Sequence, residues 1–204
     1  MMKDFREILN QYEPKPLGQR RRYAVMLPLV WNSRANSWEV LYQVRSEAVS
    51  QPGEVSFPGG ALEGNETYEE AVVRETMEEL NLSANQIEIL GEIDYMVNNR
   101  GSIHCFVGKL AIENWKDIKP NEEVARLFTI SLEALMQEPP HYYRLKTAVK
   151  PSTDFPFERI RNGVDYKFTH YDRKIPFYEL VDENIWGLTA QFTHRFTEIL
   201  DGNE

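Results

Sequence analysis

The sequence of 204 residues predicts a single α/β domain. A chain of this length falls within the usual size of one domain and is long enough to bury a substantial core. Segments that alternate as strands do lie on both sides of one stretch with the capping signals of a helix. The sequence contains no internal repeat or low-complexity tract, so we expect one domain over residues 1–204, with residues 1–20 as an N-terminal extension.

The N-terminal part is predicted to contain a short helix, a linker and two strands. The helix is expected around residues 5–11, the proline-containing linker at 14–18 and the first strand at 23–31. In the second strand, over 38–44, the residues at even positions alternate with those at odd positions, as in a strand with one better-buried face. Arg45 then ends this strand on the other face.

The central helix is predicted from its two ends. Thr67 followed by Glu70 forms a capping-box start, and the stretch 71–80 contains neither Gly nor Pro. Asn81 is a residue that tolerates the left-handed conformation of a helix end. We therefore expect a helix over about residues 68–80.

Three carboxylates in this helix indicate a metal site. At 100° per residue, Glu75 and Glu79 lie on the side that leads into the protein, and Glu78 lies on the flank beside Arg74. Like charges at this spacing repel, and burial increases the cost. A divalent cation removes the conflict, and oxygen ligands select Mg²⁺, Mn²⁺ or Ca²⁺ over Zn²⁺, with substrate phosphates completing a magnesium shell. The alternative is a solvated acidic face with an Arg74–Glu78 ion pair.

The helix and the turn before it together resemble the Nudix box. Residues 57–60 read Phe-Pro-Gly-Gly, and the two glycines let the backbone approach a ligand or metal closely. Within residues 60–82, the positions that match the box are Gly60, Glu66, Arg74, Glu75, Glu78, Glu79 and Leu82. Thr76 stands where an apolar residue is usual, and Asn81 stands where Gly is usual, but neither is a ligand position.

The resemblance implies a Nudix-type α/β/α sandwich with a mixed, curved β-sheet and a loop–helix–loop catalytic element. Members of this family hydrolyse a nucleoside diphosphate linked to another group, with Mg²⁺ or Mn²⁺ as cofactor. By similarity, Glu75 and Glu79 are the main metal ligands, and the backbone carbonyl of Gly60 is a further one. Glu78 is an additional ligand or part of the base system, and Arg74 orients it. The resemblance leaves the proton acceptor unassigned.

A second resemblance concerns the substrate. Residues 41–60 are similar to the signature that precedes the box in coenzyme A pyrophosphatases, and residues 185–190 are similar to the closing helix of that subfamily. The implied reaction converts coenzyme A, or an acyl derivative, into 3′,5′-ADP and a 4′-phosphopantetheine product. Two departures stand against it: Ser50 replaces a basic residue, and the stretch between Arg45 and Gly53 is one residue short.

Two other functions therefore stay open. One is the same chemistry on ADP-ribose, NADH or another nucleoside diphosphate compound. The other, of a different class, is a nucleotide sensor that no longer hydrolyses its ligand. The presence of all three box carboxylates favours an enzyme over a sensor.

Three residues outside the box are candidates for contact with the substrate. Arg45 can grip a phosphate through bidentate hydrogen bonds, with a pair to Glu47 or Glu54 as the alternative. Ser46 follows it in the subfamily signature. In related Nudix proteins an acidic residue near position 123 approaches the metal or the attacking water, so Glu123 is a candidate, with a surface Glu pair as the alternative.

The C-terminal half is predicted to hold further strands and two helices. A hairpin is expected at 87–97 and 104–112, joined by turn residues. The remaining expected elements are a strand at 125–130, a short helix at 132–137, strands at 142–149 and 166–171 that extend the sheet, and a helix at 185–200 that covers the sheet from one side. Trp186, in this last helix, is a candidate for a homodimer surface.

Composition restricts the class of partner. A formal net charge of −9 argues against a nucleic-acid-binding surface and requires local cations for any anionic substrate. Cys105 is the only cysteine, which excludes an intramolecular disulfide, and its apolar surroundings in the sequence predict a core thiol. The first residues lack the apolar core of a signal peptide, and no stretch has the apolar length of a membrane span, so we expect a cytoplasmic protein without membrane contact.

Overall fold

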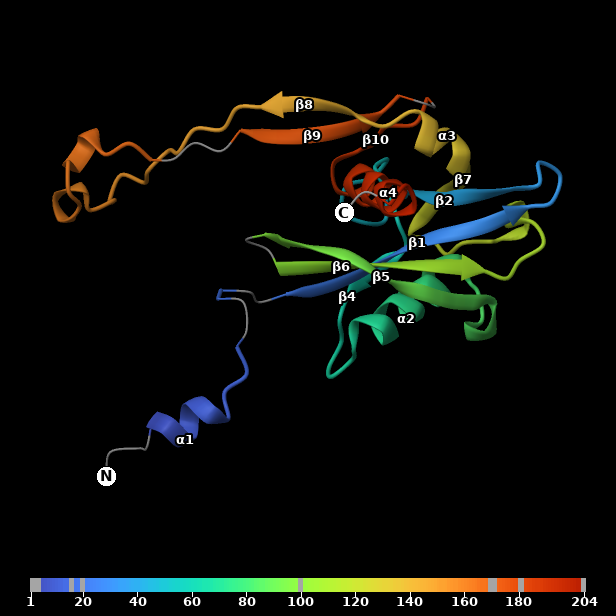
Figure 1. Cartoon of the computed structure of the whole chain (residues 1–204), viewed down its shortest axis with the longest axis horizontal. Coiled ribbons are helices and arrows are strands. Elements are labelled where there is room, and N and C mark those ends of the chain that lie inside the picture. The colour runs from blue at the N-terminus through green and yellow to red at the C-terminus, as the bar shows by residue number, and fades with distance from the viewer. Residues whose placement is uncertain are drawn as a thin grey trace. The chain divides into compact units, whose positions relative to one another are not determined.

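The computed structural model describes residues 5–14, 17–18, 21–98, 101–168, 172–179 and 182–202 (Figure 1). The chain divides into two compact units, Met1–Ser131 and Leu132–Glu204. Helix α1 (Phe5–Asn10) belongs to the first unit and confirms the short N-terminal helix. The predicted linker at 14–18 lies partly outside the described residues. The single-domain organisation over 1–204 stays a prediction.

The first unit is built on a mixed sheet with the strand order β3-β2-β1-β6-β5, in which β4 also pairs with β1 and β7 with β2. The strands are β1 (Arg22–Asn32), β2 (Ser37–Arg45), β3 (Val55–Ser56), β4 (Gly59–Ala61), β5 (Ile87–Asn98), β6 (Gly101–Leu110) and β7 (Val124–Ser131). Strands β1 and β6 are parallel, and the other pairs are antiparallel. Register shifts in the β2–β7 and β5–β6 pairs bend these strands. The predicted strands at 23–31, 87–97 and 125–130 are confirmed, and the strand predicted at 104–112 is present but runs over 101–110.

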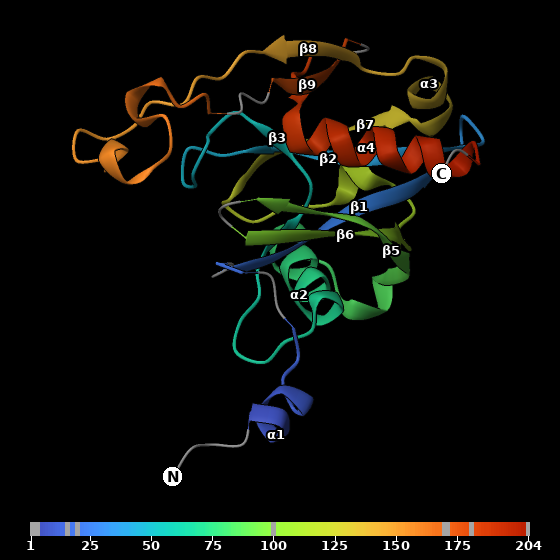
Figure 2. The ribbon, with the colours of Figure 1, turned by 60° about the vertical axis from the view of Figure 1, so that its left-hand side comes forward.

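Helix α2 (Tyr68–Leu80) lies against this sheet (Figure 2) and has the predicted bounds. Both hydrogen bonds of the Thr67–Glu70 capping box are present, and Asn81 takes the left-handed conformation with φ 50°. The buried residues that join helix and sheet are Ala24, Met26, Val30, Leu41, Ala71, Val72, Leu80, Phe106 and Leu110. Thr76 is fully buried among them. Its hydroxyl is satisfied there because it donates to the carbonyl of Val72 at 2.7 Å. Cys105 is buried, as predicted.

Strand β2 differs from the prediction in its burial. One better-buried face was expected, but residues 40–44 are buried on both faces. Leu41 belongs to the cluster under α2, whereas Tyr42 stacks on Phe57 and Phe128 on the opposite face. The strand runs between β1 and β7 in the interior of the sheet, where neither face is left to solvent.

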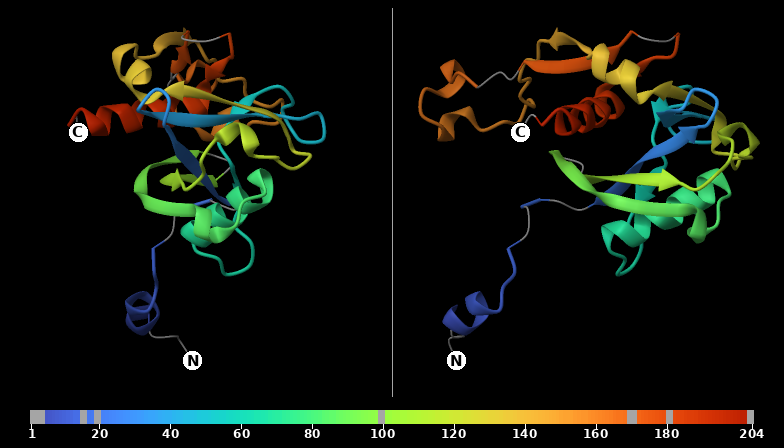
Figure 3. Two further views of the ribbon diagram at one scale, coloured as in Figure 1. Left: turned by 90° about the vertical axis from the view of Figure 1, so that its right-hand side faces the viewer. Right: turned by 45° about the vertical axis from the view of Figure 1, so that its right-hand side comes forward.

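The second unit contains a separate sheet. Helix α3 (Leu132–Gln137) is followed by β8 (His141–Leu145), β9 (Arg173–Tyr178) and β10 (Ile185–Trp186), which pair antiparallel in the order β10-β9-β8. Helix α4 (Gly187–Leu200) packs on β9 and β10 (Figure 3). Short 3-10 helices are η1 (Ala84–Gln86) and η2 (Trp115–Asp117) in the first unit, and η3 (Phe157–Arg159) and η4 (Gly163–Asp165) in the second. The predicted helix at 132–137 is confirmed.

Three predictions for this half of the chain are wrong. The strands after residue 140 do not extend the main sheet, because β8 and β9 pair with each other and with β10. Residues 166–168 are not a strand, since Tyr166 and Phe168 join a local aromatic cluster, and residues 169–171 lie outside the described residues. The last helix begins at Gly187, not at 185, because Trp186 is still paired with Phe177.

Two further expectations stay predictions. Coverage of the main sheet by the last helix depends on how the two units are arranged. Trp186 is 38% exposed and stacks on Phe177, which is consistent with either a surface aromatic or a dimer contact. Within the part of the chain that the structure describes, no helix is long and apolar enough to cross a membrane.

We predict that Gly59→Ala destabilises the protein by about 2 kcal/mol or more. Gly59 has φ 148°, and a Cβ there would lie 2.3 Å from the carbonyl oxygen of Ala24 and 2.6 Å from the Cα of Val25. Both are backbone atoms of β1, so the clash cannot be relieved by a side-chain rotation. The measurement is urea unfolding beside Gly91→Ala, where a Cβ meets nothing within 4 Å. Equal midpoints for the two variants would contradict the prediction.

Candidate functional site

The acidic pair on α2 is built around a buried carboxylate. Glu79 is 4% exposed, and its Oε2 accepts a hydrogen bond of 2.7 Å from Nε2 of Gln43 on β2. Burial raises the pKa of Glu79 to about 7, against the opposing effect of hydrogen bonds from Gln43 and the Gly59 backbone, and the charge of Glu75 raises it further. A carboxyl group at this position is therefore on the boundary between charged and neutral near physiological pH.

Gln43 was not identified from the sequence as a site residue. It is 2% exposed, and its Nε2 also lies 3.3 Å from Oγ of Ser56 and 3.5 Å from the carbonyl of Phe57. Its Oε1 is buried without a hydrogen-bond partner among the described residues. The available signal was a long polar side chain at position 43 in a strand that is otherwise apolar at its centre. An unpaired buried acceptor beside Glu79 marks a place for a water or a cation.

Glu75 lies one turn before Glu79 and contacts the glycine turn. Its side chain is 18% exposed and accepts a hydrogen bond of 2.9 Å from Nη1 of Arg74. Burial raises the pKa of Glu75 in spite of that bond, and the charges of Glu78 and Glu123 add to the increase. A Cβ on Gly60 would lie 2.3 Å from Oε1 of Glu75, so only glycine lets the main chain approach the carboxylate this closely.

Arg74 joins the loop before the helix to the acidic residues. Its Nε and Nη2 donate to the two oxygens of Glu66 at 2.8 and 3.2 Å, and Nη2 also donates to the carbonyl of Ala61 at 3.1 Å. Nη1 lies 2.9 Å from Glu75 and 3.4 Å from Glu78. The expected contact with Glu78 is present but longer than the contacts with Glu66 and Glu75. Glu66 matched the box in the sequence but had no predicted role, and the structure shows it as the bidentate partner of Arg74.

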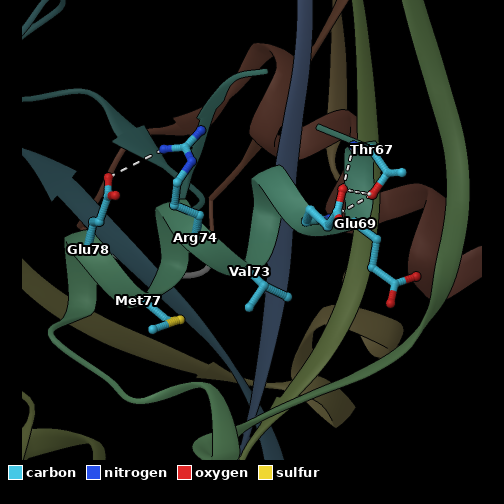
Figure 4. A pocket seen from close by; sticks show the side chains of 7 residues that line it. Thr67, Glu69, Val73, Arg74, Met77 and Glu78 are labelled. Atoms are coloured by element: carbon cyan, nitrogen blue, oxygen red, sulfur yellow. Dashed lines mark hydrogen bonds and ion pairs between the residues drawn. The ribbon is translucent and has the colours of Figure 1, made fainter. Parts of the chain in front are cut away.

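Glu78 is the exposed one of the three box carboxylates on α2. Its side chain is 57% exposed and, with Arg74, lines an open depression of about 680 Å³ on the outer face of α2 (Figure 4). The residues around this depression are Thr67, Glu69, Glu70, Val73, Arg74, Met77 and Glu78. Neither Glu75 nor Glu79 belongs to its wall, so we locate the candidate site at this acidic pair and not at the depression.

The described residues contain no group of three or more His, Cys, Asp or Glu side chains already arranged around a metal position. The reason lies in the partners of the carboxylates: Arg74 holds Glu75 and Glu78, and Gln43 holds Glu79. The donor set nevertheless fits a hard divalent cation. It offers two oxygen ligands whose burial disfavours their charged forms, next to a main chain that approaches closely at Gly60.

Three candidates lie outside the box, at the ends of β2 and β7 that pair with each other: Arg45, Ser46 and Glu123. Nε of Arg45 donates to the carbonyl of Ser50 at 2.7 Å, and Nη2 lies 3.4 Å from the Ser50 hydroxyl. The main-chain N–H of Ser46 donates to the carbonyl of Glu123 at 2.9 Å. The Glu123 side chain is exposed, and its charge contributes to the raised pKa of both Glu75 and Glu79. The structure thus ties Ser46 to Glu123 and Arg45 to its own loop.

The chain is similar to known proteins of one family. The NUDIX domain family matches residues 20–149. Nudix hydrolase 3 of Caenorhabditis elegans is 26% identical over 187 residues, covering 87% of this chain and 72% of that protein. The peroxisomal coenzyme A diphosphatase NUDT7 of Mus musculus is 29% identical over 150 residues, and the match spans 72% of this chain but only 59% of the mouse protein.

A solved structure supports the fold alone. The MutT/nudix family protein from Enterococcus faecalis matches with a TM-score of 0.52 at 17% identity, covering 98% of this chain and 70% of that one. Together with the sheet and the helix α2, the family match over residues 20–149 identifies the fold as the Nudix α/β fold with a mixed sheet. The chain therefore belongs to the Nudix family and is a Nudix hydrolase, that is, a pyrophosphohydrolase.

Proposed function

We propose that this Nudix hydrolase cleaves the diphosphate bond of coenzyme A, or of an acyl-CoA, into 3′,5′-ADP and 4′-phosphopantetheine or its acyl form. The observation that carries the chemistry is the pair formed by the buried Glu79 and the partly buried Glu75 against the glycine turn. The substrate is supported by the Arg45-Ser46 signature and by similarity to two mouse proteins, the coenzyme A diphosphatases NUDT7 and NUDT8, which are 29% and 26% identical.

We propose Mg²⁺ or Mn²⁺ as the cofactor, held by Glu75 and Glu79 with the Gly60 carbonyl and Glu78 as further ligands. Such an ion would neutralise the diphosphate oxygens and lower the pKa of the attacking water. Glu75 can serve as a ligand through Oε2 while its Oε1 keeps the bond from Arg74, or through Oε1 if that bond is released. Arg74 keeps its bidentate pair with Glu66 in that event, so the loop before the helix stays attached.

The remaining carboxylates are candidates for the proton. In the reaction, a water oxygen forms a bond to phosphorus, the phosphorus–oxygen bond of the anhydride breaks, and the water proton passes to a base. Glu78 and Glu123 are the exposed carboxylates whose charges act on Glu75, so they are accessible both to water and to the site. We assign the acceptor role to this pair without choosing between them.

Recognition of the anionic substrate falls to local cations because the chain carries a net charge of −9. We propose that Arg45 provides one of them. Its Nε is held by the Ser50 carbonyl, which fixes the direction of the guanidinium at the end of β2. Cytoplasmic location, a homodimer surface and the lack of nucleic-acid or membrane partners remain predictions.

One observation favours the second candidate function, hydrolysis of ADP-ribose, NADH or a related compound. Ser50 occupies the position where the subfamily signature has a basic residue, and the structure uses it to hold Arg45. A site with one cation fewer has less charge to distinguish the additional 3′-phosphate of coenzyme A. A non-hydrolysing sensor is disfavoured by the intact box carboxylates.

The substrate is tested by magnesium-dependent hydrolysis of coenzyme A, ADP-ribose and NADH by the purified protein. We expect kcat/KM for coenzyme A to exceed the other two by about tenfold or more. Products are separated to confirm cleavage at the diphosphate. A higher kcat/KM for ADP-ribose or NADH would contradict the coenzyme A proposal and support the second candidate function. The proposed metal chemistry would be the same in both cases.

Glu79→Gln is expected to lower kcat/KM by roughly 10²-fold or more, since it removes a charged ligand while keeping the size of the side chain. The matched control is Glu69→Gln, an exposed residue of the same helix, which we expect to keep wild-type activity. Both variants are compared with the wild type in Mg²⁺ and in Mn²⁺. Equal activity of Glu79→Gln and the wild type would remove Glu79 from the mechanism.

The raised pKa of Glu79 predicts a pH dependence of stability in the metal-free protein. The unfolded chain releases this proton near the ordinary value of 4.5, but the folded protein holds it up to about 7. The contribution of protonated Glu79 to the free energy of unfolding is therefore fully present below pH 4.5. It is lost as the pH rises through about 7, and the loss amounts to about 3 kcal/mol. Urea unfolding in chelator at pH 5 and pH 8 measures this difference.

Glu79→Gln is the control for this effect, because a neutral side chain cannot take part in it. We expect the variant to be more stable than the wild type at pH 8 without metal, and Mg²⁺ to stabilise the wild type selectively at that pH. A stability difference between the two proteins that is the same at pH 5 and pH 8 would contradict the assigned pKa.

A further inference from the structure

The segment from Lys119 to Glu123, which leads into β7, is attached to the end of helix α2. Nδ2 of Asn81 donates to the carbonyl of Lys119 at 2.8 Å. The main-chain N–H of Asn121 donates to the carbonyl of Glu79 at 2.9 Å. These two bonds use a carbonyl of the last helical turn and the capping residue, so the segment passes directly along the turn that carries the buried carboxylate.

The same segment is closed internally just before Glu123. Oδ1 of Asn121 accepts a hydrogen bond of 2.9 Å from the N–H of Glu123, as in an Asx turn. The carbonyl of Asn121 accepts a hydrogen bond of 3.3 Å from the N–H of Val124. The main-chain N–H of Glu123 is therefore bound within the turn, whereas its main-chain carbonyl needs a donor from another segment.

Ser46 supplies that donor from the end of β2. Its N–H donates to the carbonyl of Glu123 at 2.9 Å, and its hydroxyl donates to the carbonyl of Glu122 at 2.5 Å. The hydroxyl also accepts a hydrogen bond of 3.2 Å from the N–H of Ala48. One residue thus binds two successive carbonyls beside the acidic pair, at the point where the β2–β7 pairing ends in a register shift between Val44 and Arg45.

We propose that Ser46 is a positioning residue that holds the main chain of Glu122 and Glu123 against the last turn of α2, which carries Glu79. The role rests on the proposed function of this site. It replaces direct contact with the substrate as the reason for a serine at this position, because the single hydroxyl proton of Ser46 is already donated to Glu122. The influence of the Glu123 charge on both helix carboxylates is the consequence of this arrangement.

The kinetic test is a double-mutant cycle with Ser46→Ala, Glu123→Gln and the combined variant. Ser46→Ala is expected to lower kcat by roughly three- to tenfold, the range for loss of one hydrogen bond, with KM nearly unchanged. In the Glu123→Gln background the same substitution should have no further effect. Ser46→Thr, which keeps the hydroxyl, should restore most of kcat. A raised KM with unchanged kcat, or effects that multiply in the combined variant, would overturn the proposal.

Hydrogen exchange of the metal-free protein tests the arrangement without any turnover. Ser46→Ala should increase the exchange rates of the amides in segment 121–124 by about tenfold, while Ser33→Ala, in the exposed turn after β1, should leave them unchanged. Unchanged exchange in Ser46→Ala would overturn the proposal. If no diphosphate compound is hydrolysed by the wild type, the proposed function fails, and the exchange rates alone still decide the role of Ser46.

Discussion

The burial of the Glu79 carboxylate between helix α2 and strand β2 is the constraint on which the rest of the site depends. A carboxylate at 4% exposure is unfavourable unless its oxygens are satisfied, and the chain meets this demand with Gln43 and the Gly59 backbone. Both partners are positioned by the main sheet, since Gln43 lies at the centre of β2 and Gly59 begins β4. The acidic pair and the sheet therefore depend on each other, and the helix cannot rotate or shift without exposing an unpaired charge or breaking these bonds.

The glycine turn and Arg74 also hold the acidic residues of α2 in place. Gly59 lies against the backbone of β1, so a side chain there collides with atoms that cannot rotate away, whereas a side chain at Gly60 would displace the carboxylate of Glu75. Arg74 then balances the negative charge by binding Glu66 and Glu75 together. Its bond to the Ala61 carbonyl continues this connection into the loop. The Nudix box and the turn before it thus form a set of contacts around one helix. The structural residues Gly59, Glu66 and Arg74 are constrained by these contacts as much as the proposed metal ligands are.

The helix could be predicted from the sequence because its signals are local. The Thr67–Glu70 box and Asn81 specify the ends within a few residues, and the spacing of Glu75 and Glu79 specifies the face. Gln43 and the bonds of Ser46 could not be predicted, because they depend on which strands become neighbours of β2. The prediction for the second unit was wrong for the same reason, because alternation indicates a strand but not the strand with which it pairs. Strands β8 and β9 pair with each other instead of joining the main sheet. Local aromatic contacts of Tyr166 and Phe168 were also indistinguishable from strand alternation.

The residues proposed for substrate choice belong to other elements than most of those proposed for hydrolysis. The proposed hydrolytic carboxylates Glu75, Glu78 and Glu79 lie on α2, whereas the subfamily signature lies on β2 and on the loop 46–53, which is closed by the paired main chains of Arg45, Gly53 and Glu54. In this loop the main-chain carbonyl of residue 50 binds Arg45, a bond that any residue type would provide, and only the 3.4 Å contact of Nη2 with the hydroxyl is specific to Ser50. One guanidinium cannot bind both a diphosphate and a distant 3′-phosphate, so under the proposed function we expect a second cation from outside this loop to bind the 3′-phosphate of coenzyme A. The loop directs Arg45, and we expect the source of the second charge to decide between coenzyme A and ADP-ribose.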